Sequence, residues 1–211
     1  MPATKPAPAA KPARYKLRID GPCGKIEVVV EDPGPDRRGL ALIAHPHPLH
    51  GGTLDNKVVS TIANTLHELG YVAVRPNFRG VGMSEGEYDH GQGEIQDMLA
   101  VHDFVRARYP DLPLVLAGFS FGAYVQSVVS ETLRPTHLLL VGPAVGMFQM
   151  GRAPCPTIVI HGEHDDVAPT PAAQAWAAQH GFTFALVREA DHFFHKKLGE
   201  LKDHILTLCP C

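Results

Sequence analysis

The stretch LVLAGFSFGAYV, residues 114–125, is the part of the chain that decides the fold. Its first four residues form a short continuous apolar run, which is typical of β-strands that are buried on both faces of a sheet. A turn with the pattern G-x-S-x-G follows over residues 118–122, and a helical segment begins at Ala123. The stretch therefore predicts a strand, a tight turn and a helix in succession, with Ser120 in the middle of the turn.

Short apolar runs of the same kind recur along the chain. They cover residues 40–44, 71–74, 138–141, 158–160 and 184–187. Amphipathic helical segments lie between most of these runs, at residues 58–69, 95–109, 121–133 and 172–179, and a last one covers residues 196–208. Strands that alternate with helices predict an α/β fold, with a mostly parallel twisted sheet and helices on both faces. Functional residues of such sheets gather at the loops that follow the carboxyl ends of the strands.

The amino-terminal region has a different composition. Residues 1–14 hold four prolines, five alanines, three cations and no acidic residue. Such a segment buries too little apolar surface to offset the entropy of ordering it. We therefore expect a flexible tail over residues 1–14 and one domain over residues 15–211. Alternating polar and apolar residues at 15–19 and 26–30 predict two half-buried strands that form an edge hairpin.

Composition and charge exclude several classes of protein. The 211 residues are 45% hydrophobic and 19% charged, which argues against global disorder and a coiled coil. Nineteen Lys and Arg residues against 22 Asp and Glu residues leave no basic surface for nucleic acid or for an acidic membrane. No apolar run approaches the roughly 18 residues of a membrane helix.

The cysteines and the amino terminus indicate the compartment. Four cysteines, at positions 23, 155, 209 and 211, lack the spacing of a metal site or a disulfide framework. The first 14 residues lack the apolar segment of a secretory signal. We expect free thiols and a cytoplasmic protein, and the sequence does not indicate an oligomeric state.

The G-x-S-x-G pattern, between a strand and a helix, is that of a nucleophile elbow. The glycines permit a strained turn that holds the Ser120 hydroxyl above the sheet. The following helix directs its positive amino end at the place where an anionic intermediate would form. The alternative is a glycine-rich turn without a catalytic role. The context favours Ser120 as a nucleophile.

A serine nucleophile needs a histidine base, and the base needs an acid that holds its tautomer. The strand at 158–160 is followed by HGEHDDVAP, residues 161–169, which offers Glu163, Asp165 and Asp166. The strand at 184–187 is followed by READHFFH, residues 188–195, which offers His192 and His195. Both loops come after the serine in the chain, as the order serine, acid, histidine requires.

These motifs together resemble the small lidless α/β-hydrolases related to dienelactone hydrolase. The segments AHPHPLHGGTLDNKVV, residues 44–59, and RPNFRGVGMSEGEYDHG, residues 75–91, also resemble that family. The resemblance implies an α/β-hydrolase fold without a lid domain, with Asp165 as the acid and His192 as the base. Dienelactone hydrolase has cysteine where this chain has Ser120. The resemblance therefore favours an ordinary ester or thioester as the substrate.

Several neighbouring residues have alternative interpretations. Asp166 and Glu163 remain alternatives for the acid, because adjacent carboxylates in one loop cannot be told apart by pattern. We expect Asp191 to be solvated or to hold a loop amide, and His195 to be structural. We expect His161 and His164 to tie loops together.

An acyl-transfer site also needs two donors for an oxyanion, and the first is the amide of Phe121, which follows the nucleophile. The second comes from the loop HPHPLHGG, residues 45–52. Prolines have no N–H, so elimination leaves His47 and Leu49 as the nearest donors. Alignment of His45 and Pro46 with the His-Gly of related hydrolases selects His47.

These observations predict a carboxylesterase-like serine hydrolase that acts on a small-molecule ester through an acyl-enzyme, without a cofactor. About 16 residues between the strands at 138–141 and 158–160 leave no room for a lid, so we expect an open site for short acyl groups. Met147, Phe148 and Met150 are candidates for its wall. One alternative is a serine peptidase or amidase that acts on small peptides, and another is a binding protein that has kept the hydrolase shell. A metal site is disfavoured, because the zinc motif H-E-x-x-H is absent.

Overall fold

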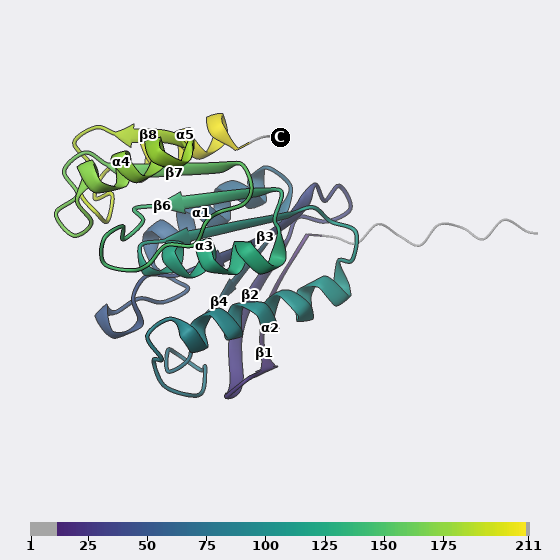
Figure 1. Cartoon of the computed structure of the whole chain (residues 1–211). Coiled ribbons are helices and arrows are strands. Elements are labelled where there is room, and N and C mark those ends of the chain that lie inside the picture. Colours follow the sequence, from purple (N-terminus) through teal and green to yellow (C-terminus); the bar gives the residue numbers. More distant parts are fainter. Residues whose placement is uncertain (1–11, 210–211) are drawn as a thin grey trace, which may run out of the picture.

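The computed structural model describes residues 12–209, and its strands form one sheet in the order β1-β2-β4-β3-β5-β6-β7-β8 (Figure 1). The pairs from β4 through β3 to β8 are parallel, whereas β1 pairs with β2, and β2 with β4, in antiparallel orientation. The α/β class and the mostly parallel sheet predicted from the sequence are therefore confirmed.

The strands and helices have the following bounds. The strands are β1 Ala13–Gly21, β2 Gly24–Asp32, β3 Gly39–Ala44, β4 Tyr71–Pro76, β5 Leu114–Phe119, β6 His137–Val141, β7 Thr157–Gly162 and β8 Thr183–Val187. The helices are α1 Lys57–Glu68, α2 Gln92–Arg108, α3 Phe121–Leu133, α4 Thr170–His180 and α5 Leu198–Leu208, with a short 3₁₀ helix, η1, over Pro48–His50.

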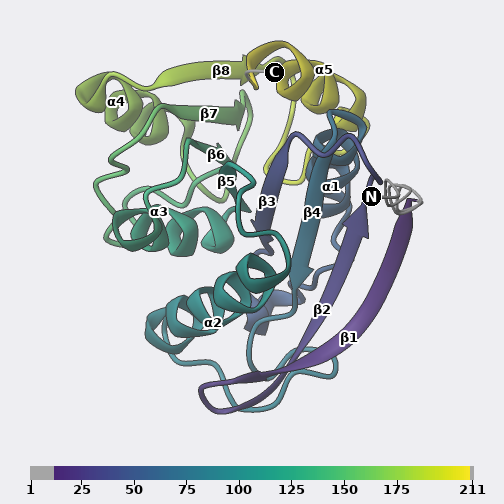
Figure 2. The same cartoon turned by 90° about the vertical axis from the view of Figure 1, so that its right-hand side faces the viewer.

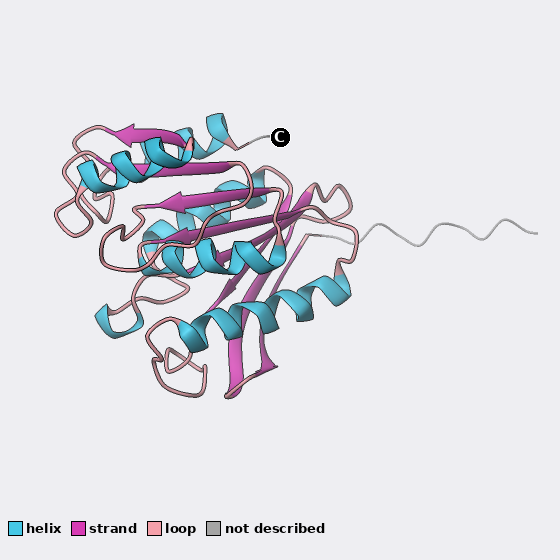
Figure 3. Cartoon of the chain, in the orientation of Figure 1, coloured by secondary structure: helices cyan, strands magenta, loops and turns pink. Residues whose placement is uncertain are grey.

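The sheet separates two hydrophobic cores, and alternate residues of each central strand contribute to opposite cores. In β3, Leu40 and Leu42 pack in the core that α2, α3 and α4 cover, whereas Ala41 and Ile43 pack in the core under α1 and α5. Figures 2 and 3 show these helices on the two sides of the sheet. Every residue of β3 is buried, which explains why its sequence is a continuous apolar run.

The structure confirms the predicted amino-terminal hairpin and moves the predicted end of the tail. The hairpin is confirmed, with Ile19 of β1 opposite Ile26 of β2. Ala13 and Arg14, which the sequence assigned to the tail, are the first residues of β1. Residues 1–11 of the expected tail lie outside the described residues. The 3₁₀ helix η1 was not predicted.

The connection between β6 and β7, residues 142–156, is a loop with one isolated bridge between Val145 and Phe148. No lid domain is inserted there, as the length of the segment predicted. Within residues 12–209, no helix has the length and apolar character needed to cross a bilayer.

The fully buried imidazole of His45 joins two loops at the carboxyl ends of the strands. Its Nδ1–H donates to the carbonyl of Pro46 at 2.7 Å, and its Nε2 accepts from the amide of Phe78 at 2.9 Å. Both ring nitrogens of the neutral tautomer are therefore satisfied. Burial lowers the pKa of His45 to about 4, although the hydrogen bond to Pro46 opposes this shift. The neutral ring thus fixes the loop that follows β3 against the loop that follows β4.

The low pKa of His45 predicts a stability that depends on pH. A histidine whose pKa falls on folding stabilises the folded state fully above the unfolded pKa of about 6.5. That contribution is lost as the pH falls from 6.5 towards 4. Between pH 7 and pH 4.5, the wild type should lose about 2–3 kcal/mol more free energy of unfolding than His45→Gln. Urea titrations at each pH measure this difference. The same change at the exposed His180 is the control and should follow the wild type; equal slopes for all three proteins would contradict the prediction.

Candidate active site

Ser120 lies in the sharp turn between β5 and α3, with φ 55° and ψ −116°. This backbone conformation is strained for a residue other than glycine. The two flanking glycines are required by close packing. A Cβ atom on Gly118 would lie 2.3 Å from the carbonyl oxygen of Gly122, and one on Gly122 would lie 2.4 Å from that of Ala44. The G-x-S-x-G pattern thus follows from the space available in the turn.

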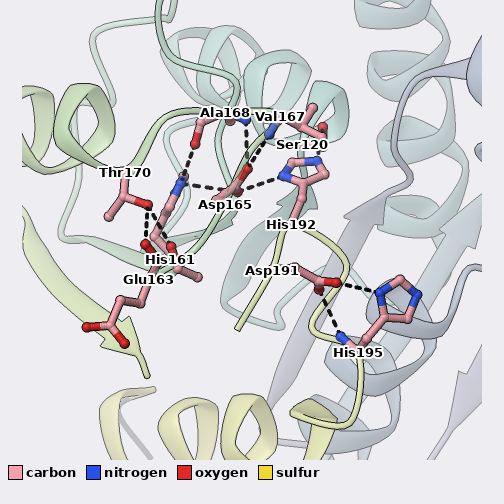
Figure 4. A network of polar contacts seen from close by, with 11 residues as sticks. Ser120, His161, Glu163, Asp165, Val167, Ala168, Thr170, Asp191, His192 and His195 are labelled. Atoms are coloured by element: carbon pink, nitrogen blue, oxygen red, sulfur yellow. Dashed lines mark hydrogen bonds and ion pairs between the residues drawn. The ribbon is translucent and has the colours of Figure 1, made fainter. Parts of the chain in front are cut away.

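Ser120, His192 and Asp165 lie in one chain of hydrogen bonds (Figure 4). His192 Nδ1 is 2.7 Å from Asp165 Oδ2, and His192 Nε2 is 3.0 Å from Ser120 Oγ. The ionised carboxylate can only accept, so Nδ1 carries the proton and Nε2 accepts from the serine hydroxyl. Asp165 follows β7 and His192 follows β8. The fold therefore brings together the serine, the acid and the histidine that the sequence selected.

The environment of Asp165 favours the ionised carboxylate. Oδ1 accepts from the amides of Val167 at 3.0 Å and Ala168 at 2.7 Å. Burial by itself would raise the pKa of Asp165, but hydrogen bonds from His161, His192 and Ala168 lower it well below its usual range. The other two carboxylates of the loop are exposed, and Glu163 accepts from the amide of Glu189 instead.

His161 contacts the acid directly, which the sequence did not predict. Its Nε2 lies 2.8 Å from the carbonyl oxygen of Ala168 and 3.2 Å from Asp165 Oδ2. Both neighbours are acceptors, so Nε2 carries the proton. The contact with Ala168 is the loop tie that we expected. A signal for the second contact was available, since His161 at the end of β7 and Asp165 in the following loop are only four residues apart.

Asp191 and His195 form a separate pair at the surface. Asp191 Oδ2 lies 2.6 Å from His195 Nδ1, and Asp191 Oδ1 accepts from the His195 amide at 3.0 Å. Asp191 thus holds a loop amide, in agreement with the expectation, and Figure 4 shows the pair apart from the chain of Ser120, His192 and Asp165. His164 is exposed, and its amide donates to the carbonyl of Ala190 at 2.8 Å.

Phe121 and His47, the candidates for oxyanion donors, are neighbours in space. Their ring centroids are 5.0 Å apart. Phe121 is the first residue of α3, so its amide lacks a partner inside the helix. Within residues 12–209, neither amide donates to a protein acceptor. The amide of Leu49, the alternative to His47, donates to His47 Nδ1 at 3.3 Å. Because the amide of Leu49 already has an acceptor, the geometry favours the amide of His47 as the second candidate oxyanion donor.

The side chain of His47 belongs to an aromatic cluster beside the serine. His47 Nε2 is 3.1 Å from Tyr88 Oη, and the ring stacks on His50 with centroids 4.5 Å apart. Burial, followed by the charges of His50 and His90, lowers the pKa of His47. Phe148, which we expected in the wall of the site, packs against Phe121 with centroids 5.3 Å apart.

A cavity of about 70 Å³ opens beside Ser120. Its lining residues are Pro46, His47, His50, Gly51, Gly52, Asn56, Ser120, Val167, His192 and Phe193. None of the three expected wall residues, Met147, Phe148 and Met150, is among them. Among the residues that the structure describes, no group of three or more His, Cys, Asp or Glu side chains is arranged to hold a metal ion.

Comparisons with known proteins agree on the fold. The family model described as "Serine aminopeptidase, S33" matches residues 47–154. An α/β serine hydrolase homologue from Coxiella burnetii is 38% identical with a TM-score of 0.86, covering 93% of this chain and 97% of its own. A lidless α/β serine hydrolase from Xanthomonas campestris is 39% identical with a TM-score of 0.82, covering 92% of both chains.

A curated relative has a defined activity. The monoglyceride lipase of Rattus norvegicus is 28% identical over 114 residues, which are 51% of this chain and 36% of the lipase.

The family match spans about half of the chain and includes the turn that contains Ser120, and the Xanthomonas structure shares the absence of a lid. The chain therefore belongs to the serine aminopeptidase S33 family of α/β serine hydrolases, in a form without a lid domain.

Proposed function

We propose that the protein hydrolyses carboxylic esters of small or short-chain acyl groups through an acyl-enzyme, with thioesters as further substrates. The observation that carries the proposal is the hydrogen-bonded series from Ser120 through His192 to Asp165. We also propose that it acts in the cytoplasm, which the free thiols of Cys23 and Cys155 support.

In the proposed mechanism, Ser120 Oγ attacks the carbonyl carbon of the ester while His192 Nε2 takes the hydroxyl proton. Asp165 holds the Nδ1–H of His192 and stabilises the imidazolium that forms. The amides of Phe121 and His47 bind the oxyanion of the tetrahedral intermediate, and one such donor contributes about 2.7–4 kcal/mol. The imidazolium then protonates the leaving alcohol. Water attacks the acyl-enzyme in the same way and releases the acid.

A serine peptidase or amidase is the second candidate, because the matching family is described as serine aminopeptidase. An aminopeptidase binds the positively charged amino group of a peptide, for which a carboxylate is the natural partner. The cavity beside Ser120 has no Asp or Glu in its lining. The ester hydrolase is therefore the better supported of the two. The relationship to monoglyceride lipase, by name an ester hydrolase, also supports it.

Replacement of the nucleophile or the base tests the mechanism. Ser120→Ala and His192→Ala should each lower kcat about 10⁶-fold, because neither residue is effective without the other. The double variant should be no worse than either single variant. Hydrolysis of p-nitrophenyl esters by purified proteins measures these rates, and a fluorophosphonate probe should label only proteins that retain Ser120. Wild-type rates in Ser120→Ala would refute the mechanism, whereas no hydrolysis by the wild type would favour a binding protein.

The identity of the acid is tested by a matched pair of variants. Asp165→Asn should lower kcat about 10⁴-fold, because the amide favours the wrong tautomer of His192. Asp166→Asn removes the same charge from the next residue, which is exposed, and should change kcat little. The same ester assay compares the two variants. The reverse ranking would move the role to Asp166.

A substrate panel separates the two candidate functions. Acetyl to butyryl p-nitrophenyl esters should give the highest kcat/KM, and the value should fall for longer acyl chains because the cavity is small. Aminoacyl p-nitroanilides should be poor substrates. Faster Ser120-dependent turnover of the anilides than of any ester would select the peptidase.

A further inference from the structure

A second cavity lies next to the one beside Ser120. It has a volume of about 230 Å³ and is lined by Asn56, Lys57, Val58, Phe193, Phe194, His195, Lys196 and Leu198. Asn56 and Phe193 line both cavities, so the two spaces adjoin across these side chains. Phe193, one of the two shared lining residues, is 44% exposed.

The charges of the second cavity are all of one sign. Its lining contains two lysines and a histidine but no carboxylate. Within residues 12–209, neither Lys57 nor Lys196 has an ion pair, whereas the chain as a whole has a net charge of −3. An unpaired cationic cavity on an acidic protein is a favourable place for an anion.

The nearby carboxylates already have partners. Asp191 lies 2.6 Å from His195 Nδ1. Glu189 and Glu200 lie 3.4 Å and 3.3 Å from Lys197 Nζ. Asp55, which precedes Asn56 in the chain, is exposed and is not part of the lining. These contacts leave the charges of Lys57 and Lys196 available to a ligand.

Both lysines are exposed residues on a backbone that hydrogen bonds hold in place. Lys57 is the first residue of α1, and the Asn56 side chain caps this helix by accepting from Val58 N at 2.9 Å. The positive end of the helix dipole therefore adds to the charge of the lysine. Lys196 lies two residues after Phe194, whose side chain is fully buried. The carbonyl of Phe194 accepts from the amide of Lys197 at 2.9 Å.

We propose that this cavity is a specificity subsite, in which Lys57 and Lys196 bind a carboxylate carried by the ester substrate. The inference rests on the proposed ester hydrolysis and names the class of substrate: an ester with a carboxylate in its acyl part or in its alcohol part. The same cations repel the ammonium group of a peptide amino terminus.

Two pairs of substrates test the subsite. In the first pair, the mono-p-nitrophenyl ester of glutaric acid is compared with its neutral methyl ester, which places the anion in the acyl part. In the second pair, 4-acetoxybenzoate is compared with its methyl ester, which places the anion in the leaving group. The readout for each pair is the ratio of kcat/KM for the anionic ester to kcat/KM for the neutral ester. A ratio cancels effects on folding and on the catalytic groups.

Removal of the two charges should lower the ratio in at least one pair. For Lys57→Gln combined with Lys196→Gln, we expect a decrease of about tenfold, as for two partly exposed ion pairs. Lys57→Glu combined with Lys196→Glu should lower it further, and 0.5 M NaCl should lower the ratio of the wild type. Arg38→Gln combined with Arg134→Gln is the control. It removes two exposed cations at the opposite end of the parallel strands and should keep the wild-type ratio.

The outcomes separate the subsite from the proposed function. If both ratios are the same in the lysine variants and in the arginine control, while neutral esters are still hydrolysed through Ser120, the subsite is wrong and the ester hydrolase stands. If the wild type hydrolyses none of the four esters through Ser120, both proposals fail.

Discussion

The close packing of Gly122 against the end of β3 is the constraint on which the site depends. A Cβ atom at Gly122 would lie 2.4 Å from the carbonyl oxygen of Ala44 and 2.5 Å from that of His45. Only glycine lets α3 begin this near to β3. The same approach holds Ser120 in its strained conformation and brings the amide of Phe121 towards the loop that contains His47. One steric condition thus determines the position of Ser120, the proposed nucleophile, and of both candidate oxyanion donors.

The buried charge of the site is compensated by donors that the fold supplies locally. The side chain of Asp165 is inaccessible to solvent and would be costly to ionise alone. The carboxylate accepts hydrogen bonds from the amides of Val167 and Ala168 in its own loop. The imidazoles of His161, at the end of β7, and of His192 lie against its other oxygen. This arrangement explains why Asp165, and neither of its acidic neighbours, occupies the position beside His192. Asp166 and Glu163 are exposed, so their charges need no such partners.

The sequence predicted the elements whose structure depends on residues close together in the chain. The strand at residues 114–119 could be located because a buried strand has a continuous apolar sequence. The turn and α3 could be located because a tight turn needs glycines and a helix against a sheet has amphipathic spacing. The choice of Asp165 over its acidic neighbours rested on resemblance. The contact of His161 with Asp165 and the second cavity were not predicted. That cavity joins residues 56–58 to residues 193–198, and no periodicity links segments so far apart in the chain.

The absence of a lid does not leave the proposed catalytic groups in water. His192 is 2% exposed, Asp165 7% and Ser120 8%, because the loops that follow the strands cover them. The ring of Phe119 packs on His192 with centroids 5.0 Å apart. Hydrogen bonds in such a dry environment are stronger than in water, and their geometry is set before substrate arrives. A lid could therefore contribute mainly to substrate selection. In its absence, substrate selection depends on the residues around the open cavity, among which Phe193 also lines the cavity that holds the two lysines.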